Sequence, residues 1–503
     1  MGSNQAIKEK IKADVVILGG GGAGLAAAVA AAESGARNVV VLEKVGIGGN
    51  SALAWGMFAA ESPAQKRALI DCRRDDCFKI AMDFAHWKIN PRIVRAFIDK
   101  SGDTIRWLEE KGLVFKCIPF YPNQMPVTWH IPEGRGSALI KLLTQNCLDL
   151  GVDLLTHTRA KKIMTGPKGN IRGVLAESKG EDFTIAAKGV VVATGGYGGN
   201  KKLLKKHCPE YHDNMWRTGV PQTGEGLAMA MELGANTEGL GTLLLGGPAP
   251  QKNVQIKVGV PPNTFRIGLM PMALEPYTIW VNKRGERFAD ETLGYKHFQS
   301  SKPVARQPDN ISYTVFDAKM VRTMVEEGLV IAIDQELAIS AKGLSPGAKG
   351  HKLPGLEKAL QKVAEKDIVH ISNSWKGLAE WICCGHGILK ATVHEYNSYC
   401  DRGHDPVFAK DPKYMLPLRT PPYYAIKCHS GFVNTIGGIK INELMEVLDK
   451  QDNPIPGLYA AGVDTGGWES DDYCDLLSGS ALGFAINSGR LAGENAVKFI
   501  CSS

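Results

Sequence analysis

The sequence lacks the features that would mark a membrane, secreted or nucleic-acid-binding protein. Its first 15 residues contain no apolar run of the signal-peptide kind, and the most apolar stretch, residues 13–32, has five glycines at its centre. No long Lys/Arg block occurs, although 59 basic residues exceed 52 acidic ones. We therefore predict no membrane span and no nucleic-acid partner.

The 11 cysteines follow no zinc or haem spacing. They are odd in number and scattered, so we expect free thiols and a cytoplasmic location. Cys383, Cys384 and His386 are close together, but no second ligand pair stands at zinc spacing and no CxxCH haem motif occurs. We expect no bound metal.

Disorder is also excluded, because 44% of the residues are hydrophobic and only 22% are charged. What the sequence has in excess is glycine: 57 of 503 residues, or about 11%, where about 7% is usual. The excess is local. Of the 57 glycines, 27 lie in six segments, residues 19–24, 46–56, 189–199, 224–226, 431–438 and 457–493.

The first glycine segment lies between two apolar runs that predict buried strands, residues 14–18 and 39–42, with an alanine-rich helix over 25–34. Gly19, Gly21 and Gly24 form the spacing GxGxxG between the first strand and the helix. Such glycines permit a tight turn, close approach of a pyrophosphate to the backbone, and close packing of helix on strand. The pattern predicts a dinucleotide site.

An acidic residue completes this pattern. Glu43 follows Gly24 by 19 residues at the end of the second strand, where a carboxylate can accept from a ribose hydroxyl. The turn 48–56, GGNSALAWG, offers further backbone amides for a cofactor that extends beyond its adenosine half. Only one GxGxxG is present, so FAD is favoured and direct NAD(P)H binding is unsupported.

The two chain ends share this glycine-rich texture, whereas the middle has more proline and predicts amphipathic helices over 356–365 and 381–396. We expect an insertion into a nucleotide-binding domain, with the domain split into residues 1–250 and 420–503 and the insertion at 251–419.

Nine motifs stand in the order found in one flavoprotein family. They are GxGxxG with Glu43, GGNSALAWG at 48–56, EGRG at 133–136, ATGG at 193–196, TGEG at 223–226, NKRGERFADE at 282–291, TIGGIKI at 435–441, GLYAAG at 457–462, and the closing helix with Gly489, Arg490 and Gly493. Together they resemble the fumarate reductase and succinate dehydrogenase flavoproteins, a family that also holds urocanate reductase and 3-ketosteroid dehydrogenases.

The resemblance implies an α/β fold: a Rossmann-like, glutathione-reductase-like FAD-binding domain with an inserted α+β capping domain. It implies hydride transfer between flavin N5 and a C=C or CH–CH bond next to a carbonyl. No histidine stands in GGNSALAWG, so FAD is expected to be non-covalent. The implied cofactor residues are Gly19, Gly21, Gly22, Ala23, Gly24, Glu43, Lys44, Gly48, Gly49, Asn50, Ser51, Gly56, Ala193, Thr194, Gly195, Gly196, Gly224, Glu225, Gly462, Gly479, Ser480, Ala481 and Leu482.

The sequence departs from true fumarate reductases at four positions. The catalytic arginine falls at Tyr295, one substrate histidine at Gly247, a second at Asn434, and the second arginine at Leu476. Loss of these charge-assisted hydrogen bonds argues against a dicarboxylate such as fumarate or succinate.

Tyr295 resembles the tyrosine of ketosteroid dehydrogenases and urocanate reductase, which implies proton transfer; the alternative is a tyrosine that only packs on substrate. The segment LSGSALG at 477–483 resembles a ketosteroid dehydrogenase subgroup, which implies Ser478 or the Gly479 amide near the reacting carbon, against ordinary hydrogen bonding in a flavin loop. Tyr473 and Asp475 are weaker candidates.

Aromatic residues flank several motifs. Phe120, Tyr121, Trp129 and Trp468 suit the walls of a site for a flat apolar ring, although core packing is the favoured explanation for any single one of them. His130 and His429 are read as structural histidines.

The leading hypothesis is an FAD oxidoreductase acting on a bulky cyclic enone, with an external electron donor or acceptor. One alternative is reduction of an aryl or heteroaryl acrylate anchored by Arg135 or Arg266, and another is the flavin subunit of a larger electron-transfer assembly.

Overall fold

The computed structural model of the protein describes residues 9–121, 123–167, 169–218, 221–250, 254–260, 263–330, 339–340, 343–344 and 352–502. The chain forms two compact units. The chain-end unit takes the described parts of Met1–Pro209, Thr218–Leu244 and Asn434–Ser503, and the inserted unit takes Glu210–Arg217 and Leu245–Val433. Among the described residues, no helix combines the length and the apolarity needed to cross a membrane.

The expected boundaries at 250/251 and 419/420 differ from these crossings. The chain passes between the units inside two long strands, β13 (Thr237–Ala249) and β21 (Tyr423–Ile439), which pair with each other. The short segment Glu210–Arg217 also joins the inserted unit. Local composition does not mark such crossings, because each lies inside a continuous strand and no loop or linker separates the two units there.

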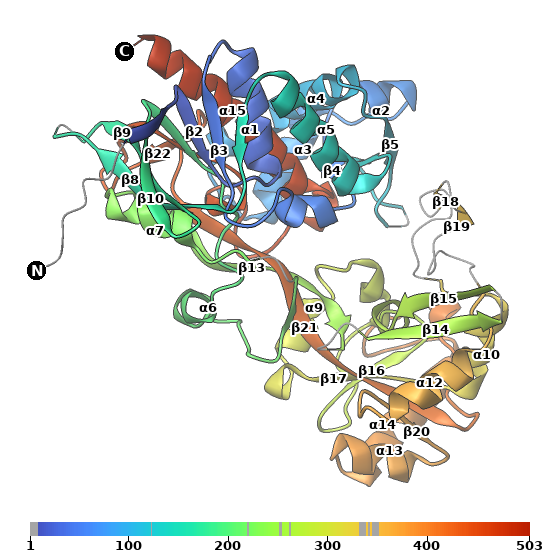
Figure 1. The fold of residues 1–503 in the computed structure, drawn as a ribbon. Coiled ribbons are helices and arrows are strands. Elements are labelled where there is room, and N and C mark those ends of the chain that lie inside the picture. The colour runs from blue at the N-terminus through green and yellow to red at the C-terminus, as the bar shows by residue number, and fades with distance from the viewer. Residues whose placement is uncertain are drawn as a thin grey trace, which may run out of the picture. The chain divides into compact units, whose positions relative to one another are not determined.

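The centre of the chain-end unit is a six-stranded sheet in the order β22-β23-β11-β2-β3-β7 (Figure 1). Strands β2, β3 and β11 are short apolar runs with every residue buried, as is typical of parallel strands covered on both faces. The bounds are β2 Val15–Leu18, β3 Val39–Leu42, β7 Asp153–Leu155, β11 Gly189–Val192, β22 Glu446–Leu448 and β23 Pro454–Ala460.

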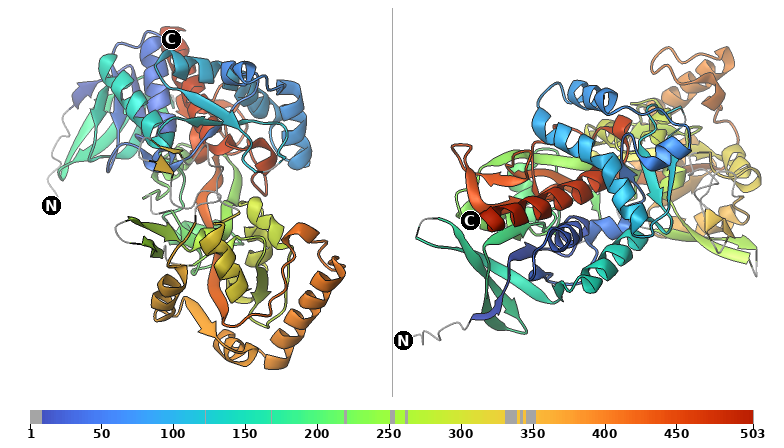
Figure 2. Two further views of the ribbon diagram at one scale, coloured as in Figure 1. Left: turned by 90° about the vertical axis from the view of Figure 1, so that its right-hand side faces the viewer. Right: turned by 90° about the horizontal axis from the view of Figure 1, so that it is seen from above.

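Helices α1 (Gly22–Glu33) and α15 (Ser480–Ser502) bring the two ends of the chain together, and Figure 2 shows the blue and red helices side by side. Glycines make this close contact possible. An added Cβ on Gly489 or Gly493 would lie 2.2 Å from the carbonyl oxygen of Ala23 or Ala27, respectively. The C-terminal helix therefore belongs to the same core as the first β-α-β unit.

Two smaller sheets and further helices complete the chain-end unit. The sheets have the orders β1-β10-β9-β8 and β4-β6-β5. The bounds are β1 Glu9–Lys12, β4 Met57–Phe58, β5 Phe115–Ile118, β6 Trp129–Pro132, β8 Thr158–Thr165, β9 Ile171–Ser178, β10 Glu181–Ala186, η1 Gly49–Leu53, α2 Pro63–Arg67, α3 Arg74–Phe84, α4 Pro91–Glu110, α5 Arg135–Asp149, α6 Lys201–His207, α7 Glu225–Glu232, η5 Gly462–Asp464 and η6 Asp475–Leu477.

The inserted unit is built around β21, which pairs antiparallel with β17 and β20 and parallel with β12. Apolar clusters pack around this strand. The bounds are β12 Trp216–Arg217, β14 Gln255–Val260, β15 Asn263–Gly268, α8 Met270–Ala273, β16 Ile279–Asn282, η2 Glu291–Tyr295, α9 Ser301–Ala305, η3 Pro308–Asn310, β17 Ser312–Asp317, α10 Ala318–Glu326, β18 Ile339–Ser340, β19 Gly343–Leu344, α12 Leu356–Ala364, β20 Val369–Ser372, α13 Trp375–Ile382, α14 His386–Arg402 and η4 Pro412–Tyr414.

The helix expected over 381–396 is wrong as a single element. The chain forms α13 up to Ile382, turns at Cys383 with φ +63°, and begins α14 at His386. Apolar periodicity continues across the break, because both helices pack on the same cluster through Leu378, Ile382 and Leu389.

Candidate active site

The glycine turn after β2 is shaped by close backbone approach. Gly19 has φ +109°, and an added Cβ on Gly24 would lie only 1.9 Å from the Gly19 carbonyl oxygen, so α1 packs directly on the turn. Gly21 differs, since its nearest protein atom would be 4.0 Å from such a Cβ. The space beside Gly21 is therefore open at the N-terminus of a helix, where amides and the helix dipole favour an anion.

Glu43 holds this turn to the end of β3. Its carboxylate accepts hydrogen bonds from the backbone amides of Gly20 (2.9 Å) and Val45 (2.8 Å). Each carboxylate oxygen has further lone-pair capacity for a ribose hydroxyl. The structure thus gives Glu43 a structural role at the position expected to contact the cofactor.

The neighbouring residue Lys44 is committed elsewhere. Its ammonium donates to Thr223 Oγ1 and Glu225 Oε2, both at 2.8 Å, and Arg159 pairs with the other Glu225 oxygen at 2.7 Å. Gly224 precedes α7 in the left-handed region, with φ +78°. Lys44, Gly224 and Glu225, all expected near the cofactor, therefore lie together, joined by an ion pair.

The second glycine turn packs against the first. The Gly22 amide donates to Ser51 Oγ at 3.2 Å, and the Gly48 amide donates to the Gly20 carbonyl oxygen at 2.9 Å. Gly49 lies beside Gly21 in the same turn, and the Asn50 amide group donates to Asn434 Oδ1. Residues 19–24 and 48–51 thus form one continuous surface of backbone and small side chains, which we call the cradle.

Asp464 organises a third glycine turn beside the cradle, and the sequence analysis missed it. Its buried carboxylate accepts from Thr194 Oγ1 (2.9 Å), the Gly195 amide (2.8 Å) and the Gly196 amide (2.9 Å), while Ala193 continues β11. Burial raises the pKa of Asp464, and these hydrogen bonds oppose that rise. The signal was the acid two residues after GLYAAG, which ends at Gly462.

The start of α15 contains the proposed catalytic segment. Gly479 turns with φ +89°, and its carbonyl oxygen accepts from the Phe58 amide at 2.9 Å. The buried Ser478 hydroxyl donates to the Asp475 carbonyl oxygen (2.9 Å) and accepts from Gln124 Nε2 (2.7 Å). Packing and loop hydrogen bonds therefore account for Ser478, which leaves the Gly479 backbone as the stronger of these two candidates.

Tyr473 lies under the same helix start, fully buried. Its hydroxyl accepts from the Ala481 amide at 3.3 Å, and burial raises its pKa. Nearby, Glu469 accepts from Ser480 Oγ at 3.3 Å, and burial raises the pKa of this carboxyl to about 8. This region is a buried polar support for the turn, with Leu482 packed into the core beside it.

The donor set of the chain-end unit fits FAD. The cradle offers open backbone at a helix N-terminus for a diphosphate, a carboxylate at the end of β3 for a ribose, and glycine turns at 195–196 and 479. Gly462, with φ +71°, would place a Cβ only 3.0 Å from Ala23 Cβ, so backbone and methyl group are in close contact there. Every residue expected to bind the cofactor lies in this unit.

In the inserted unit, Tyr295 is the last residue of the short helix η2. The first residue of this helix, Glu291, belongs to a buried network of charged side chains. Glu291, at the start of η2, accepts from Arg287 at 2.8 Å through both of its oxygens and from Lys410 at 2.9 Å. Arg287 also donates to Asp405 at 2.6 Å. Burial alone would raise the pKa of Glu291, but Lys410 and Arg287 hold it below its ordinary value.

Tyr295 does not stand alone. Tyr414 Oη donates to Tyr295 Oη at 3.1 Å, and the two ring centroids are 5.9 Å apart. We call these residues the tyrosine pair. Burial raises the pKa of the Tyr295 phenol well above its ordinary value. Tyr295 is therefore a neutral phenol near pH 7, which suits a proton donor rather than a base.

The other aromatic candidates differ in exposure. Trp129 and Trp468 are 4% and 3% exposed; Trp129 packs on Gly56, and Trp468 stacks on Phe484 with centroids 4.4 Å apart. Packing therefore accounts for both tryptophans, whereas Tyr121 is partly exposed and leaves ring surface for a ligand. His130 is buried with hydrogen bonds to Ser62 and Thr128, and burial lowers its pKa to about 4.

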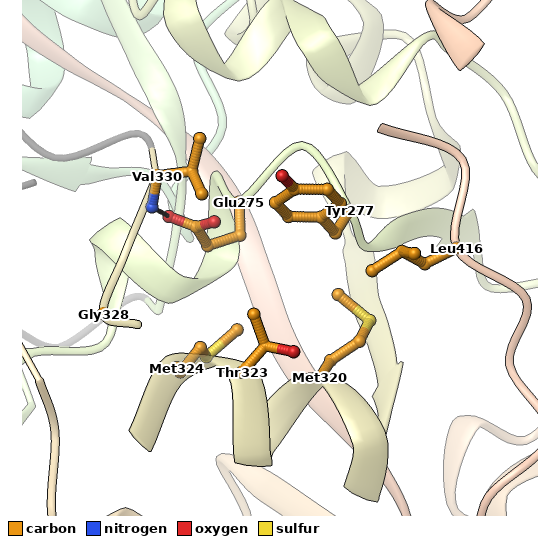
Figure 3. Close-up of a pocket in the computed structure, with 8 residues that line it drawn as sticks. All are labelled: Glu275, Tyr277, Met320, Thr323, Met324, Gly328, Val330 and Leu416. Atoms are coloured by element: carbon orange, nitrogen blue, oxygen red, sulfur yellow. Dashed lines mark hydrogen bonds between the residues drawn. The ribbon is translucent and has the colours of Figure 1, made fainter. Parts of the chain in front are cut away.

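Figure 3 shows a pocket in the inserted unit whose lining includes Tyr277 but neither residue of the tyrosine pair. Its empty volume of about 230 Å³, with open solvent included, is below the about 300–1,000 Å³ of typical ligand sites. Its one carboxylate, Glu275, accepts from the Val330 amide at 2.8 Å. The walls are otherwise mostly apolar, formed by Tyr277, Met320, Thr323, Met324, Gly328, Val330 and Leu416.

Comparison with known proteins agrees with this cofactor assignment. A family model described as an FAD binding domain matches residues 14–471. Vinyl phenol reductase of Lactiplantibacillus plantarum is 30% identical over 97% of this chain and 96% of its own length.

Two solved structures have the same architecture. The open conformation of a flavocytochrome c3 fumarate reductase superposes with a TM-score of 0.74 at 26% identity, covering 98% of this chain and 79% of that one. The 3-ketosteroid-Δ4-(5α)-dehydrogenase of Rhodococcus jostii RHA1 gives 0.73 at 23% identity, covering 98% and 99%, which shows a shared fold. The chain therefore belongs to the FAD-binding family of the fumarate reductases and is an FAD-dependent oxidoreductase that acts on C=C or CH–CH bonds.

Proposed function

We propose that the protein is an ene-reductase whose substrate has its C=C bond conjugated to an aromatic ring, as in a vinylphenol or an aryl acrylate. The observation that carries the proposal is the neutral Tyr295 phenol, hydrogen-bonded to Tyr414, in place of the family's catalytic arginine. A phenol donates a proton without presenting a guanidinium fork to a second carboxylate.

The chemistry balances with one proton from the protein. The cradle residues would hold FAD, which when bound and reduced would supply a hydride to one carbon of the C=C bond. Tyr295 supplies a proton to the other carbon, its O–H bond breaking as the new C–H bond forms. The electrons enter from an external donor.

Similarity supports an aryl substrate over the cyclic enone that the sequence favoured. A relative that is 30% identical to almost the whole chain is named for reduction of a vinyl phenol. The ketosteroid dehydrogenase shares 23% identity, which supports the fold alone. The cyclic enone stays as the second candidate because Gly479 forms a positive-φ turn at the segment that resembles those enzymes.

A substrate panel tests this proposal. Enzyme supplied with a reduced dye is given 4-vinylphenol, cinnamate, urocanate, 4-androstene-3,17-dione and fumarate, and kcat/KM is measured for each. We expect 4-vinylphenol or cinnamate to exceed the steroid and fumarate by at least about tenfold. Turnover of the steroid alone would favour the second candidate, and efficient turnover of fumarate would refute both.

The role of Tyr295 has its own test. We expect Tyr295→Phe to keep the flavin absorption spectrum while the rate of substrate-dependent flavin reoxidation falls by about 10²–10⁴-fold, the usual contribution of general acid catalysis. An unchanged rate would remove Tyr295 from the mechanism.

We also propose that FAD is held without a covalent bond, because the turns 19–24 and 48–56 contain no histidine, cysteine or tyrosine. Precipitation of the holoenzyme with trichloroacetic acid should leave the flavin in the supernatant. Flavin that stays with the pellet would contradict this.

A further inference from the structure

Tyr414 is joined to Tyr295 by a hydrogen bond whose direction is informative. Tyr414 Oη donates to Tyr295 Oη at 3.1 Å. Each phenol has a single proton, so the Tyr295 proton is free to point toward another acceptor while its oxygen accepts from Tyr414. In this arrangement Tyr295 can donate its proton to a substrate and then receive a new proton from Tyr414.

A buried ion pair fixes the distance between the two phenols. Glu291 lies four residues before Tyr295, and Lys410 lies four residues before Tyr414. The Lys410 ammonium donates to Glu291 Oε2 at 2.9 Å and to the Thr278 carbonyl oxygen at 2.8 Å, with both charged side chains fully buried. The two segments that carry the phenols are thus tied together one short helix away from them.

The surroundings of Tyr295 oppose a lasting phenolate. Burial, Glu275 and Tyr277 raise the pKa of Tyr295, so the anion left after proton donation is unfavourable there. Tyr277 packs on Tyr414 with ring centroids 5.5 Å apart, and the exposed Lys413 places its ammonium 4.7 Å from the Tyr414 ring centroid. Tyr414, partly exposed beside Lys413, reaches water.

We propose that Tyr414 is a positioning residue that returns a proton to Tyr295 after each turnover, an inference that rests on the proposed function. The Tyr414 O–H bond breaks as the Tyr295 O–H bond re-forms, and the Tyr414 phenolate then takes a proton from water. The net result is one proton moved from solvent to the substrate carbon for each hydride delivered.

Comparison of a single turnover with continuous turnover tests the proposal in the holoenzyme. Tyr295 is already protonated at the first turnover. When pre-reduced Tyr414→Phe enzyme is mixed with 4-vinylphenol or cinnamate, its single-turnover rate of flavin reoxidation should therefore be within about threefold of the wild-type rate. The steady-state kcat should fall at least about tenfold, with KM unchanged, because every later turnover waits for a proton.

The pH profile separates this role from a structural one. The kcat of Tyr414→Phe should rise from pH 9 to pH 6 and with buffer acid concentration, because solvent acids then reprotonate Tyr295 directly, while the wild-type kcat stays nearly flat. Tyr277→Phe, which removes a hydroxyl from the neighbouring ring, is the matched control and should keep kcat.

Three outcomes would overturn the proposal: a wild-type kcat in Tyr414→Phe at every pH, an equal loss in Tyr277→Phe, or a parallel fall of single-turnover rate and kcat without pH dependence. Failure of the proposed function is distinct, since it would appear as an undiminished single-turnover rate in Tyr295→Phe.

Discussion

The geometry of the cradle and the geometry around the tyrosine pair are stabilised by different kinds of chemical group. In the cradle, backbone amides and glycines make the contacts, and Glu43 and Asp464 accept from main-chain donors. Around the tyrosine pair, charged side chains make them, through Glu291, Lys410 and Arg287. The cradle therefore depends on a backbone conformation that glycine allows. Proton donation by Tyr295, in contrast, depends on side chains that are far apart in the sequence and come into contact in the fold.

The largest effect is expected from filling the cradle. In Gly24→Ala the new Cβ would lie 1.9 Å from the Gly19 carbonyl oxygen, so α1 must move away from β2 and the turn must open. Overpacking of this kind costs about 1–3 kcal/mol or more, and here it also displaces the anion site. We expect soluble protein with little bound flavin, measured as the 450 nm to 280 nm absorbance ratio.

Gly189→Ala is the control for this prediction, because the added methyl group in β11 would meet its nearest atoms at 3.6–3.8 Å, an ordinary contact distance. It should retain flavin. If Gly24→Ala bound flavin as well as Gly189→Ala, close backbone approach would not be what specifies the cradle.

The second effect concerns the inserted unit. Lys410→Met removes a buried cation and leaves the Thr278 carbonyl oxygen without its donor, which should lower the free energy of unfolding by about 3–5 kcal/mol. The midpoint of urea unfolding, followed by tryptophan fluorescence, measures this. Flavin content at low urea should stay normal, because the cradle residues lie in the other unit.

Lys413 provides the matched comparison three residues further on. Its ion pair with Asp411 is exposed, so Lys413→Met should leave the unfolding midpoint unchanged. Equal midpoints for the two variants would show that the buried network does not stabilise the inserted unit.

The same contrast explains what could be read from the sequence. The pattern at residues 14–43 predicted β2, α1 and β3 to within a few residues, because buried parallel strands are continuous apolar runs and GxGxxG marks their junction with the helix. FAD followed from the same local signals, and the family match confirms it.

Long-range contacts could not be read in this way. Tyr414 is 119 residues from Tyr295, and Asp464 is 268 residues from Gly196, so no local pattern joins them. The break at Cys383 was missed although the signal was local. The spacing of apolar residues typical of a helix continues through Cys383, where the backbone is not helical. The catalytic roles proposed for Ser478 and Tyr473 stay predictions. Both side chains make buried hydrogen bonds that stabilise the start of α15 whether or not they take part in catalysis.

The smallest effect sharpens the comparison through two buried glutamates. Glu291 is paired with cations, and its pKa is lowered; Glu469 receives hydrogen bonds from Ser480 Oγ and the Cys474 backbone, and burial raises its pKa to about 8. An acid whose folded-state pKa exceeds its unfolded value of about 4.3 favours folding fully below the unfolded pKa and loses that contribution as pH rises to the folded pKa. Glu469→Gln should therefore match the wild type near pH 4 and exceed it by a few kcal/mol in unfolding free energy near pH 8.5, since each pKa unit is worth about 1.4 kcal/mol. Asp471→Asn, an exposed carboxylate in the same loop, should show no such divergence. A constant difference between Glu469→Gln and wild type across this range would mean that Glu469 ionises like a solvent-exposed acid, and the contrast between the two glutamates would be lost.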